Sequence, residues 1–384
     1  MIIALSFFWI SAIILVYIYL GYPVLIALLA LFKPGRASGE LTFKLPRVSL
    51  IIPAHNEEKV IGKKIENSLS LDYPENLLSI VIVSDGSTDR TNELVNEFAS
   101  NPRIRFIQYQ PRRGKAHALN IGVAASESEI IVFSDANIRY EPDSIRMLVR
   151  NFSIPSVGCV CGKVLLEKAT GSTEPLGEGI YMRYERFIHQ NESRFYTMIG
   201  TDGAMYAIRR ELSSPLPEDA IVDDFIIAMS VLKKNYRIVY EPKAIGFEEA
   251  ASSVGQEFKR KVRMIAGGFQ AIGILGTVLN PFLHPIVFFQ FISHKLLRWL
   301  APIFMLALFV TNVLLLFRHF YQLSLLAQLI FYSLAMIGAI QESIRKRALF
   351  YFPYYFCALN LAAAIGLRRF LTGNQPVKWE KVSR

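Results

Sequence analysis

Cysteine is scarce in this chain. Three cysteines occur among 384 residues, at positions 159, 161 and 357. So few cysteines exclude a disulfide framework, and the single residue between Cys159 and Cys161 does not match the two-residue gap of a zinc-binding pair. The three side chains fit small core residues in a reducing compartment, because free cysteine is one of the most frequently buried residues.

Charge is absent from a long stretch at the start of the chain. Residues 2–32 contain no charged residue, although the whole chain has a formal net charge of +10. About 20 apolar residues cross a bilayer core as a helix, so this stretch predicts a membrane anchor over residues 1–33. A cleaved signal peptide is not expected, since a basic start, a short apolar core and a small-residue cleavage site are all missing.

Polar residues are also rare towards the other end of the chain, where residues 296–371 are mostly Leu, Ile, Phe, Ala and Tyr. This region predicts about three further transmembrane helices, at residues 296–317, 323–340 and 349–367. The third helix contains Pro353 and Asn360 and is the weakest of the set. So few polar side chains interrupt these helices that the sequence shows no lined ion path.

Basic residues near the spans predict which side of the membrane each segment faces. Lys33, Arg36, Lys44 and Arg47 follow the first span. Because basic loops stay on the cytoplasmic side, the central domain is expected in the cytoplasm and the N-terminus outside. Three later spans would place the basic tail, residues 372–384, outside as well, which conflicts with the same rule. One of the four segments is therefore expected to be interfacial or re-entrant.

The net positive charge would fit nucleic acid or an anionic membrane surface equally well on its own. The predicted spans favour lipid headgroups and anionic substrates, so nucleic acid is not an expected partner. A multi-pass protein of the cell membrane is the predicted setting.

The region between the spans, residues 47–250, alternates strand and helix patterns. A continuous apolar strand at residues 48–53 precedes a helical pattern with Val60, Ile61 and Ile65 on one face. Strand and helix then alternate through residue 137. This alternation predicts an α/β domain whose parallel sheet carries helices on both faces. Residues 251–295 read as amphipathic helices that lie in the membrane interface.

Polar residues follow the predicted strands, at the edge where such sheets bind ligands. The candidates are Pro53, His55 and Glu57 after the first strand, Asp85 after the second, Lys115 in a basic loop, and Asp135 and Asn137 after a later strand. Each has a plainer interpretation alone: Glu57 could cap a helix, Asp85 could belong to a turn, and Lys115 could be a solvated charge. Their joint occurrence favours a site.

Four motifs in this region carry a family resemblance. "PAHNEE", "SDGSTD", "RRGKAHALN" and "FSDAN" occur in this order between residues 53 and 137. The arrangement resembles the membrane-embedded family 2 glycosyltransferases with the GT-A fold, which include cellulose, hyaluronan and poly-N-acetylglucosamine synthases, and it extends over residues 47 to about 270. The resemblance implies a nucleotide-sugar donor, with UDP expected, whose nucleoside contacts Glu57 and Asp85 and whose diphosphate lies near Lys115.

The resemblance also implies a divalent cation, Mg²⁺ or Mn²⁺, bound by Asp135 together with the phosphate oxygens. The second acidic ligand is replaced by Asn137. Both ions prefer oxygen ligands and often take only one or two protein carboxylates, and an Asn side chain still offers a carbonyl oxygen. We therefore predict a working metal site with weakened affinity. The alternative is a site that has lost its metal.

The second half of the domain is expected to bind the acceptor. "IGTDGAMYAIRR" (199–210) resembles the family's glycine-containing loop and acceptor-facing helix, which implies acceptor contacts at Gly200, Asp202 and Gly203. The alternative is a glycine turn before a core strand.

An acidic pair, Asp223 and Asp224, opens the next helical pattern. Carboxylates at this position could simply cap the helix and complement its dipole. In the family the second acid of such a pair is the general base, which maps to Asp224, with Asp223 in place of the usual Glu. Direct displacement at an anomeric carbon needs a base for the acceptor hydroxyl, so we expect inversion.

The last motif departs from the family pattern. Processive synthases usually show Gln, two residues, then Arg-Trp, whereas this chain has Arg260, Arg263 and then Met264. The arginines can still face the diphosphate. Without the stacking Trp, the sequence does not predict whether sugar addition is processive. Further on, His294 and Trp299 could tie the interface to the next span, but anchoring in the headgroup layer by Trp and Arg is favoured.

Together with these patterns, the resemblance implies an inverting, metal-dependent glycosyltransferase that acts on a membrane-associated saccharide or a lipid-linked acceptor in cell-surface glycan synthesis. A polyprenyl-phosphate monosaccharide transferase is the second enzyme hypothesis, because a phosphate acceptor needs no strong base. A non-catalytic membrane sensor of nucleotide-sugars is the hypothesis from another class.

Overall fold

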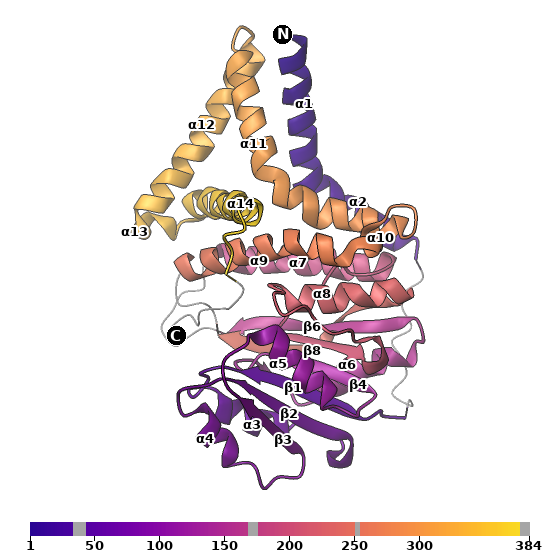
Figure 1. The fold of residues 1–384 in the computed structure, drawn as a ribbon. Helices are drawn as coiled ribbons and strands as arrows, with labels where there is room; N and C mark the ends of the chain where they lie inside the picture. The colour runs from indigo at the N-terminus through magenta and orange to yellow at the C-terminus, as the bar shows by residue number, and fades with distance from the viewer. Residues whose placement is uncertain (34–43, 168–175, 250–253, 377–384) are drawn as a thin grey trace.

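The computed structural model describes all residues except 34–43, 168–175, 250–253 and 377–384. Arg36 and the end of the predicted basic tail therefore lie outside the described residues. The structure is layered: an α/β domain carries a layer of helices on one side, and apolar helices rise from that layer (Figure 1).

The α/β domain is built on one mixed sheet. Among the described residues the sheet has eight strands in the order β3-β2-β1-β4-β7-β6-β8-β5. The strands are β1 (Val48–Ala54), β2 (Leu78–Asp85), β3 (Ile104–Tyr109), β4 (Ile130–Ser134), β5 (Arg139–Tyr140), β6 (Val157–Glu167), β7 (Met205–Arg209) and β8 (Arg237–Glu249). The prediction of a parallel sheet is confirmed for β1 to β4, which pair in parallel.

The second half of the sheet is not parallel throughout. Strand β7 runs antiparallel to both β4 and β6, and its first residue, Met205, pairs with Ser134 at the end of β4. The chain therefore enters β7 at the carboxyl edge of β4 and runs back. The prediction of a helix after the Gly200 turn is wrong, because residues 205–209 form this core strand.

Alternate residues of the strands face two apolar layers, as the period of a strand requires. Leu50 and Ile52 pack with one helical layer, and Ile51 packs with the other. The first layer contains α3 (Ile61–Leu69), α4 (Thr91–Asn96) and α6 (Ser144–Val149); the second contains α5 (Lys115–Ala124) and α8 (Asp223–Ser230). Cys159 and Cys161 are buried in the second layer, which confirms their interpretation as core residues.

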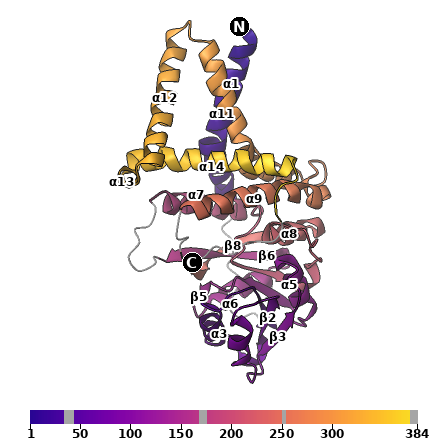
Figure 2. The ribbon, with the colours of Figure 1, turned by 60° about the vertical axis from the view of Figure 1, so that its left-hand side comes forward.

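Further helices separate the sheet from the uppermost helices (Figure 2). They are α2 (Tyr22–Leu31), α7 (Leu176–Phe195), α9 (Val254–Leu275), α10 (Pro285–Phe291) and α14 (Ala348–Leu371). Two glycines allow close packing here. A Cβ on Gly366 of α14 would lie 2.9 Å from the carbonyl oxygen of Val262 in α9, and a Cβ on Gly268 would lie 2.5 Å from the ring of Trp299.

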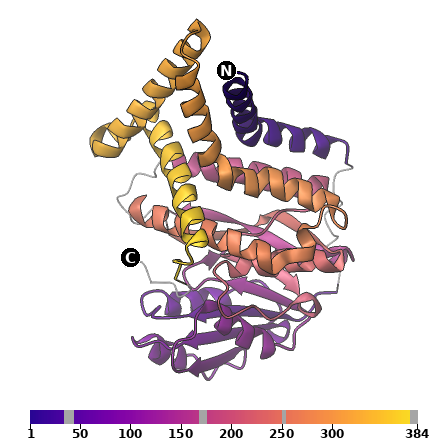
Figure 3. The ribbon, with the colours of Figure 1, turned by 45° about the horizontal axis from the view of Figure 1, so that its top comes forward.

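Five helical segments are long and apolar enough to cross a membrane, counted over the described residues: Ile2–Leu31, Gly255–Leu279, Pro285–Leu314, His319–Ile340 and Ala348–Leu371. In the figures α1 (Ile2–Val16), α11 (Leu297–Leu314) and α12 (His319–Ile340) stand upright, whereas α14 lies across them along the helical layer (Figures 1 and 2). The first segment bends at the π-helical turn Tyr17–Gly21, so that α2 leaves α1 sideways (Figure 3).

Candidate active site

A lysine connects the two halves of the domain at the carboxyl edge of the sheet. Lys115 begins α5, Asp135 follows β4, and Asp223 begins α8. The ammonium Nζ of Lys115 lies 2.8 Å from Asp135 Oδ1 and 3.4 Å from Asp223 Oδ2. Partial burial opposes the charged form of the lysine, but the two carboxylates outweigh it and raise the pKa of Lys115. Lys115 is therefore charged at neutral pH and holds two acids of the site together.

Asp85 positions the loop that delivers this lysine. Its Oδ1 accepts hydrogen bonds from the backbone N–H of Arg113 at 2.7 Å and the hydroxyl of Tyr109 at 2.9 Å, and its Oδ2 accepts one from the N–H of Gly114 at 2.9 Å. Gly114 has φ +110°, a conformation that suits glycine. The predicted nucleoside-binding acid thus fixes the backbone directly before Lys115.

The loop after β1 packs against the loop after β2. His55 contacts the carbonyl oxygen of Asp85 through Nδ1 at 2.7 Å, and the N–H of Glu57 donates to Thr91 Oγ1 at 2.7 Å. Burial and the nearby Arg112 lower the pKa of His55. Pro53 lines the same small depression as Lys115 and the two carboxylates it binds. The structure therefore brings the predicted donor residues of the first four motifs to one edge.

The candidate metal ligands Asp135 and Asn137 lie on a turn that a buried lysine stabilises. The buried Lys64 donates from Nζ to the carbonyl oxygen of Ile138 at 2.6 Å, directly after Asn137, and burial lowers the pKa of Lys64 to about 7. The amide nitrogen of Asn137 lies 3.3 Å from Glu248 Oε1 on β8. Because the nitrogen faces Glu248, the amide oxygen of Asn137 points the other way. Sequence reasoning missed Glu248, which lies far along the chain and in no motif.

The acidic pair at the start of α8 packs against the glycine turn. A Cβ on Gly203 would lie 2.9 Å from Asp224 Oδ2, and a Cβ on Gly200, where φ is +86°, would lie 2.6 Å from the ring of Phe225. Both glycines are thus required by close packing. Burial and the neighbouring Asp223 raise the pKa of Asp224 to about 7, while Lys115 acts in the opposite direction.

Three further residues predicted from the sequence lie on helix α9 and in the glycine turn. Arg263 on α9 interacts electrostatically with Asp223 and Asp224, so its positive charge lies on the side of the acidic pair. Arg260 instead donates from Nε to Glu257 Oε2 at 2.8 Å on its own helix. Asp202 lies in the glycine turn, and burial raises the pKa of its carboxyl group.

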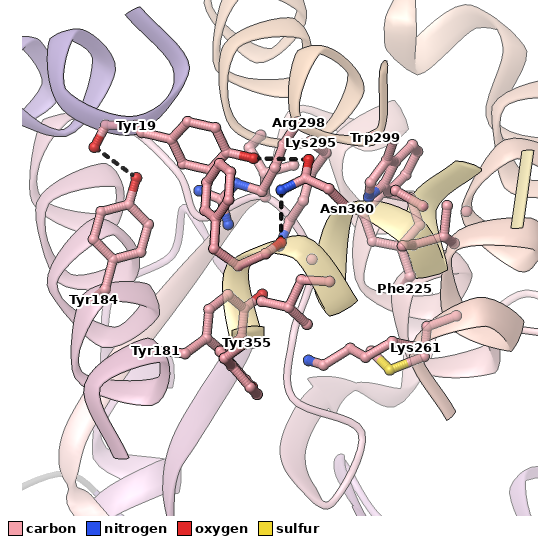
Figure 4. A pocket seen from close by; sticks show the side chains of 18 of the residues that line it. Tyr19, Tyr181, Tyr184, Phe225, Lys261, Lys295, Arg298, Trp299, Tyr355 and Asn360 are labelled. Carbon is pink, nitrogen blue, oxygen red and sulfur yellow. Dashed lines mark hydrogen bonds between the residues drawn. The ribbon is translucent and has the colours of Figure 1, made fainter. Parts of the chain in front are cut away.

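A cavity of about 450 Å³ opens on the other side of Asp224. Its lining includes Gly200, Thr201 and Asp224 at the edge of the α/β domain. The remaining walls come from helices α7, α9, α11 and α14, as the labelled side chains show (Figure 4). Aromatic rings form much of the wall: Tyr19, Tyr181, Tyr184, Phe225, Trp299, Tyr351, Phe352, Tyr355 and Phe356. Sequence reasoning missed this cavity, although the spacing of Tyr351 and Tyr355 places both on one face of a helix.

Trp299 belongs to the protein interior, contrary to the headgroup anchoring that the sequence favoured. Its ring packs at 5.3 Å from Phe269 and 5.9 Å from Phe291, measured between centroids. His294 is fully buried, with Nδ1 2.9 Å from Glu192 Oε1. Both side chains therefore join the helices above to the layer below.

A histidine and glutamate cluster lies near the cavity. Ligand atoms of Glu185, His189 and His294 lie within 4.8 Å of one another, which could hold a metal. Glu185, however, already pairs with Arg298, and with Lys295 at 3.6 Å. Burial and the nearby Lys295 lower the pKa of His189 to about 3. Because cations already neutralise this glutamate, the cluster fits an ion-pair network between helices better than a metal site.

Comparison with known proteins agrees with this geometry. The profile of the family described as "Glycosyl transferase family 2" matches residues 49–215, which include the strand-end residues described above. The chain carries a family 2 glycosyltransferase domain. This match confirms the resemblance that the four motifs indicated.

Named relatives belong to the same class. A poly-beta-1,6-N-acetyl-D-glucosamine synthase of Staphylococcus epidermidis is 25% identical over 229 residues, which are 59% of this chain and 55% of that protein. The probable glycosyltransferase YdaM of Bacillus subtilis is 29% identical over 282 residues, 70% of this chain and 67% of that protein. The match thus spans about half the length of the synthase.

The fold of this chain is shared with a solved structure. The mannosyltransferase PcManGT from Pyrobaculum calidifontis, solved with GDP-Man and Mn²⁺, superimposes with a TM-score of 0.70 and 22% identity. The likeness covers 95% of this chain and 99% of that one, including the helices above the sheet. The predicted GT-A fold with additional membrane-type helices is confirmed.

Proposed function

We propose that this protein transfers a sugar, with inversion, from a nucleotide-sugar to an acceptor that enters from the membrane. The observation that carries the proposal is the position of Asp224. Its carboxylate belongs to the same acidic pair as Asp223, which Lys115 joins to the donor edge, and it also lines the cavity under the apolar helices. A base between a donor site and an acceptor cavity can take the hydroxyl proton on the face opposite the leaving group.

The donor side supports a diphosphate. Lys115 and Arg263 both lie near the acidic pair, and charge-assisted hydrogen bonds from such cations suit phosphate oxygens. A leaving nucleoside diphosphate would gain negative charge in the transition state, and these cations would stabilise it. We propose a UDP-sugar, and GDP-mannose is the first alternative because PcManGT was solved with GDP-Man.

A divalent cation fits the oxygen ligands at the end of β4. The carboxylate of Asp135 and the outward amide oxygen of Asn137 would hold Mg²⁺ or Mn²⁺, with phosphate and water completing the shell. The ion would neutralise charge on the diphosphate. The carboxylate of Glu248 adds a second negative charge close by and offsets the one that Asn137 lacks.

Replacing Glu248 with Gln is expected to weaken Mn²⁺ binding about tenfold in the presence of UDP, because one nearby unit charge is lost. The Gln side chain keeps an oxygen that can accept from the Asn137 amide. Mn²⁺ titration followed by electron paramagnetic resonance measures the change. Glu249→Gln, at the exposed neighbouring residue, is the matched control. Equal affinity in all three proteins would remove Glu248 from the metal site.

The arrangement of the helices suggests how the protein sits in a membrane. We propose that α1, α11 and α12 cross the bilayer, because they stand upright and α11 alone is about 27 Å long against a core of about 30 Å. Helix α14 would lie in the interface. Three crossings place the basic C-terminal tail on the cytoplasmic side with the α/β domain, which removes the conflict between span number and charge.

A donor panel tests the proposed function. The full chain in lipid nanodiscs would be given UDP-sugars and GDP-mannose with Mn²⁺, and nucleotide release and the anomeric configuration of the product would be measured. We expect one donor to give an inverted product, and chelation of the metal to stop transfer. A product with retained configuration would contradict the mechanism. Nucleotide binding without release by any donor would favour the sensor hypothesis.

A further inference from the structure

The cavity above Asp224 has one long apolar wall. Helix α14 contributes Tyr351, Phe352, Tyr355, Phe356 and Leu359, whose spacing places them on one face. This wall follows the helix that lies across the upright ones (Figure 2). It suits a hydrocarbon chain, and the aromatic rings also suit the face of a sugar.

The same cavity holds an excess of positive charge. Lys261, Lys295 and Arg298 line it (Figure 4), and the described residues of the lining include one carboxylate, that of Asp224. All three cations are largely buried, with side chains 14%, 19% and 14% exposed. Charges at this depth cost desolvation free energy unless they are paired, and in membrane-type segments they usually mark a functional site.

Each glutamate that pairs with these cations is shared between two of the basic side chains around the cavity. Glu185 pairs with both Arg298 and Lys295, and Glu257 pairs with Lys261 at 3.6 Å and also with Arg260. Within the described part of the chain, Nε and Nη2 of Arg298 are buried without a hydrogen-bond acceptor. Buried donors of this kind need a partner. Oxygen atoms of an anion would supply it.

We infer that the acceptor is a lipid whose glycan is joined to the hydrocarbon through a phosphate group, and that this group binds between Lys261 and Arg298. The inference rests on the proposed function and specifies its acceptor. A phosphate brings both the negative charge and the oxygens that a guanidinium and an ammonium recognise. A neutral polysaccharide would leave the three cations without a further charge partner.

Each part of such an acceptor would contact a different part of the cavity. The hydrocarbon follows α14, the phosphate lies among the cations, and a sugar hydroxyl reaches Asp224 in the lining. In the transfer, the hydroxyl oxygen bonds to the anomeric carbon of the donor while the bond from that carbon to the nucleotide diphosphate breaks. The proton passes to Asp224. The phosphate of the lipid takes no part in bond making.

Binding of a C55 polyprenyl phosphate to the purified full chain in detergent tests the inference. We expect Lys261→Met to weaken retention of the labelled lipid at least about tenfold, and Lys261→Arg to restore most of it, because the charge is what matters. Lys259→Met is the matched control, since Lys259 is exposed on the same helix and does not line the cavity. Equal retention by all four proteins would overturn the inference.

Two further measurements distinguish binding of polyprenyl phosphate from binding of an ordinary phospholipid headgroup and from binding of nucleotide at the donor site. We expect the polyprenyl phosphate to outcompete phosphatidylglycerol, and equal competition would overturn the inference in favour of a general headgroup site. Binding of UDP with Mn²⁺ would be measured on the same samples. Nucleotide binding with no lipid binding overturns the acceptor inference alone. Lipid binding without nucleotide binding supports the anion site and overturns the proposed function.

Discussion

Replacing Asp224 with Asn is expected to lower the rate of sugar transfer by about 10²- to 10⁴-fold, which is the usual contribution of a general base. The amide keeps the size of the side chain but cannot accept the hydroxyl proton. Nucleotide and metal binding should change little, because Lys115 contacts Asp223 and Asp135. Transfer would be measured in nanodiscs with saturating donor, alongside Kd for UDP.

The pH profile gives the same prediction a second readout. Burial raises the pKa of Asp224 to about 7, and the active form of a base is the deprotonated one. Transfer should therefore rise about tenfold per pH unit below the pKa of the loaded enzyme and level off above it. A bound metal cation would move this pKa downwards. In the Asp224→Asn variant the residual rate should lose this dependence. Near-normal transfer by that variant would favour the polyprenyl-phosphate transferase, whose acceptor needs no base.

Replacing Lys115 with Met is expected to raise the Kd for the nucleotide-sugar about 100-fold. The lysine would otherwise donate a charge-assisted hydrogen bond worth about 1.5–3 kcal/mol to the diphosphate. Its loss also leaves Asp135 and Asp223 without the cation that joins them, and both would repel the incoming phosphates. Isothermal titration with UDP and Mn²⁺ measures the change.

Two variants control for a folding defect in that experiment. Lys115→Arg keeps the charge and should recover part of the affinity, while Lys63→Met removes an exposed lysine from α3 and should bind as the unaltered protein does. Unchanged affinity in Lys115→Met would mean that this lysine serves the apo fold and does not contact the donor.

The sequence predicts which polar residues meet at the carboxyl edge of the sheet because strand ends are local features. An apolar run followed by an acid needs no knowledge of the rest of the chain, and parallel pairing then brings Lys115 and Asp135 together. The acidic pair is equally local, since Asp223 and Asp224 open the helix that was expected there. The helix expected after the Gly200 turn rested on the family resemblance alone, and the alternative of a glycine turn before a core strand is the one the structure has.

The cavity was less predictable, because its wall is assembled from segments far apart in the chain. Lys261 reads as one of several charges on a basic helix, and Arg298 reads as a headgroup anchor at the start of a span. Only packing shows that both face one cavity with Asp224. Glu248 is a similar case, because its contact with Asn137 joins two segments that no local pattern relates.

Helix α14 lies across the upright helices, and this position predicts which acceptor concentration, per membrane area or per volume, sets the reaction rate. Helix α14 walls the cavity, so the lipid acceptor proposed above would reach Asp224 by lateral movement within one leaflet. Its supply then depends on molecules per unit area of membrane and is independent of the bulk volume. Diluting the acceptor with inert lipid should slow transfer, whereas diluting the vesicles in buffer should not.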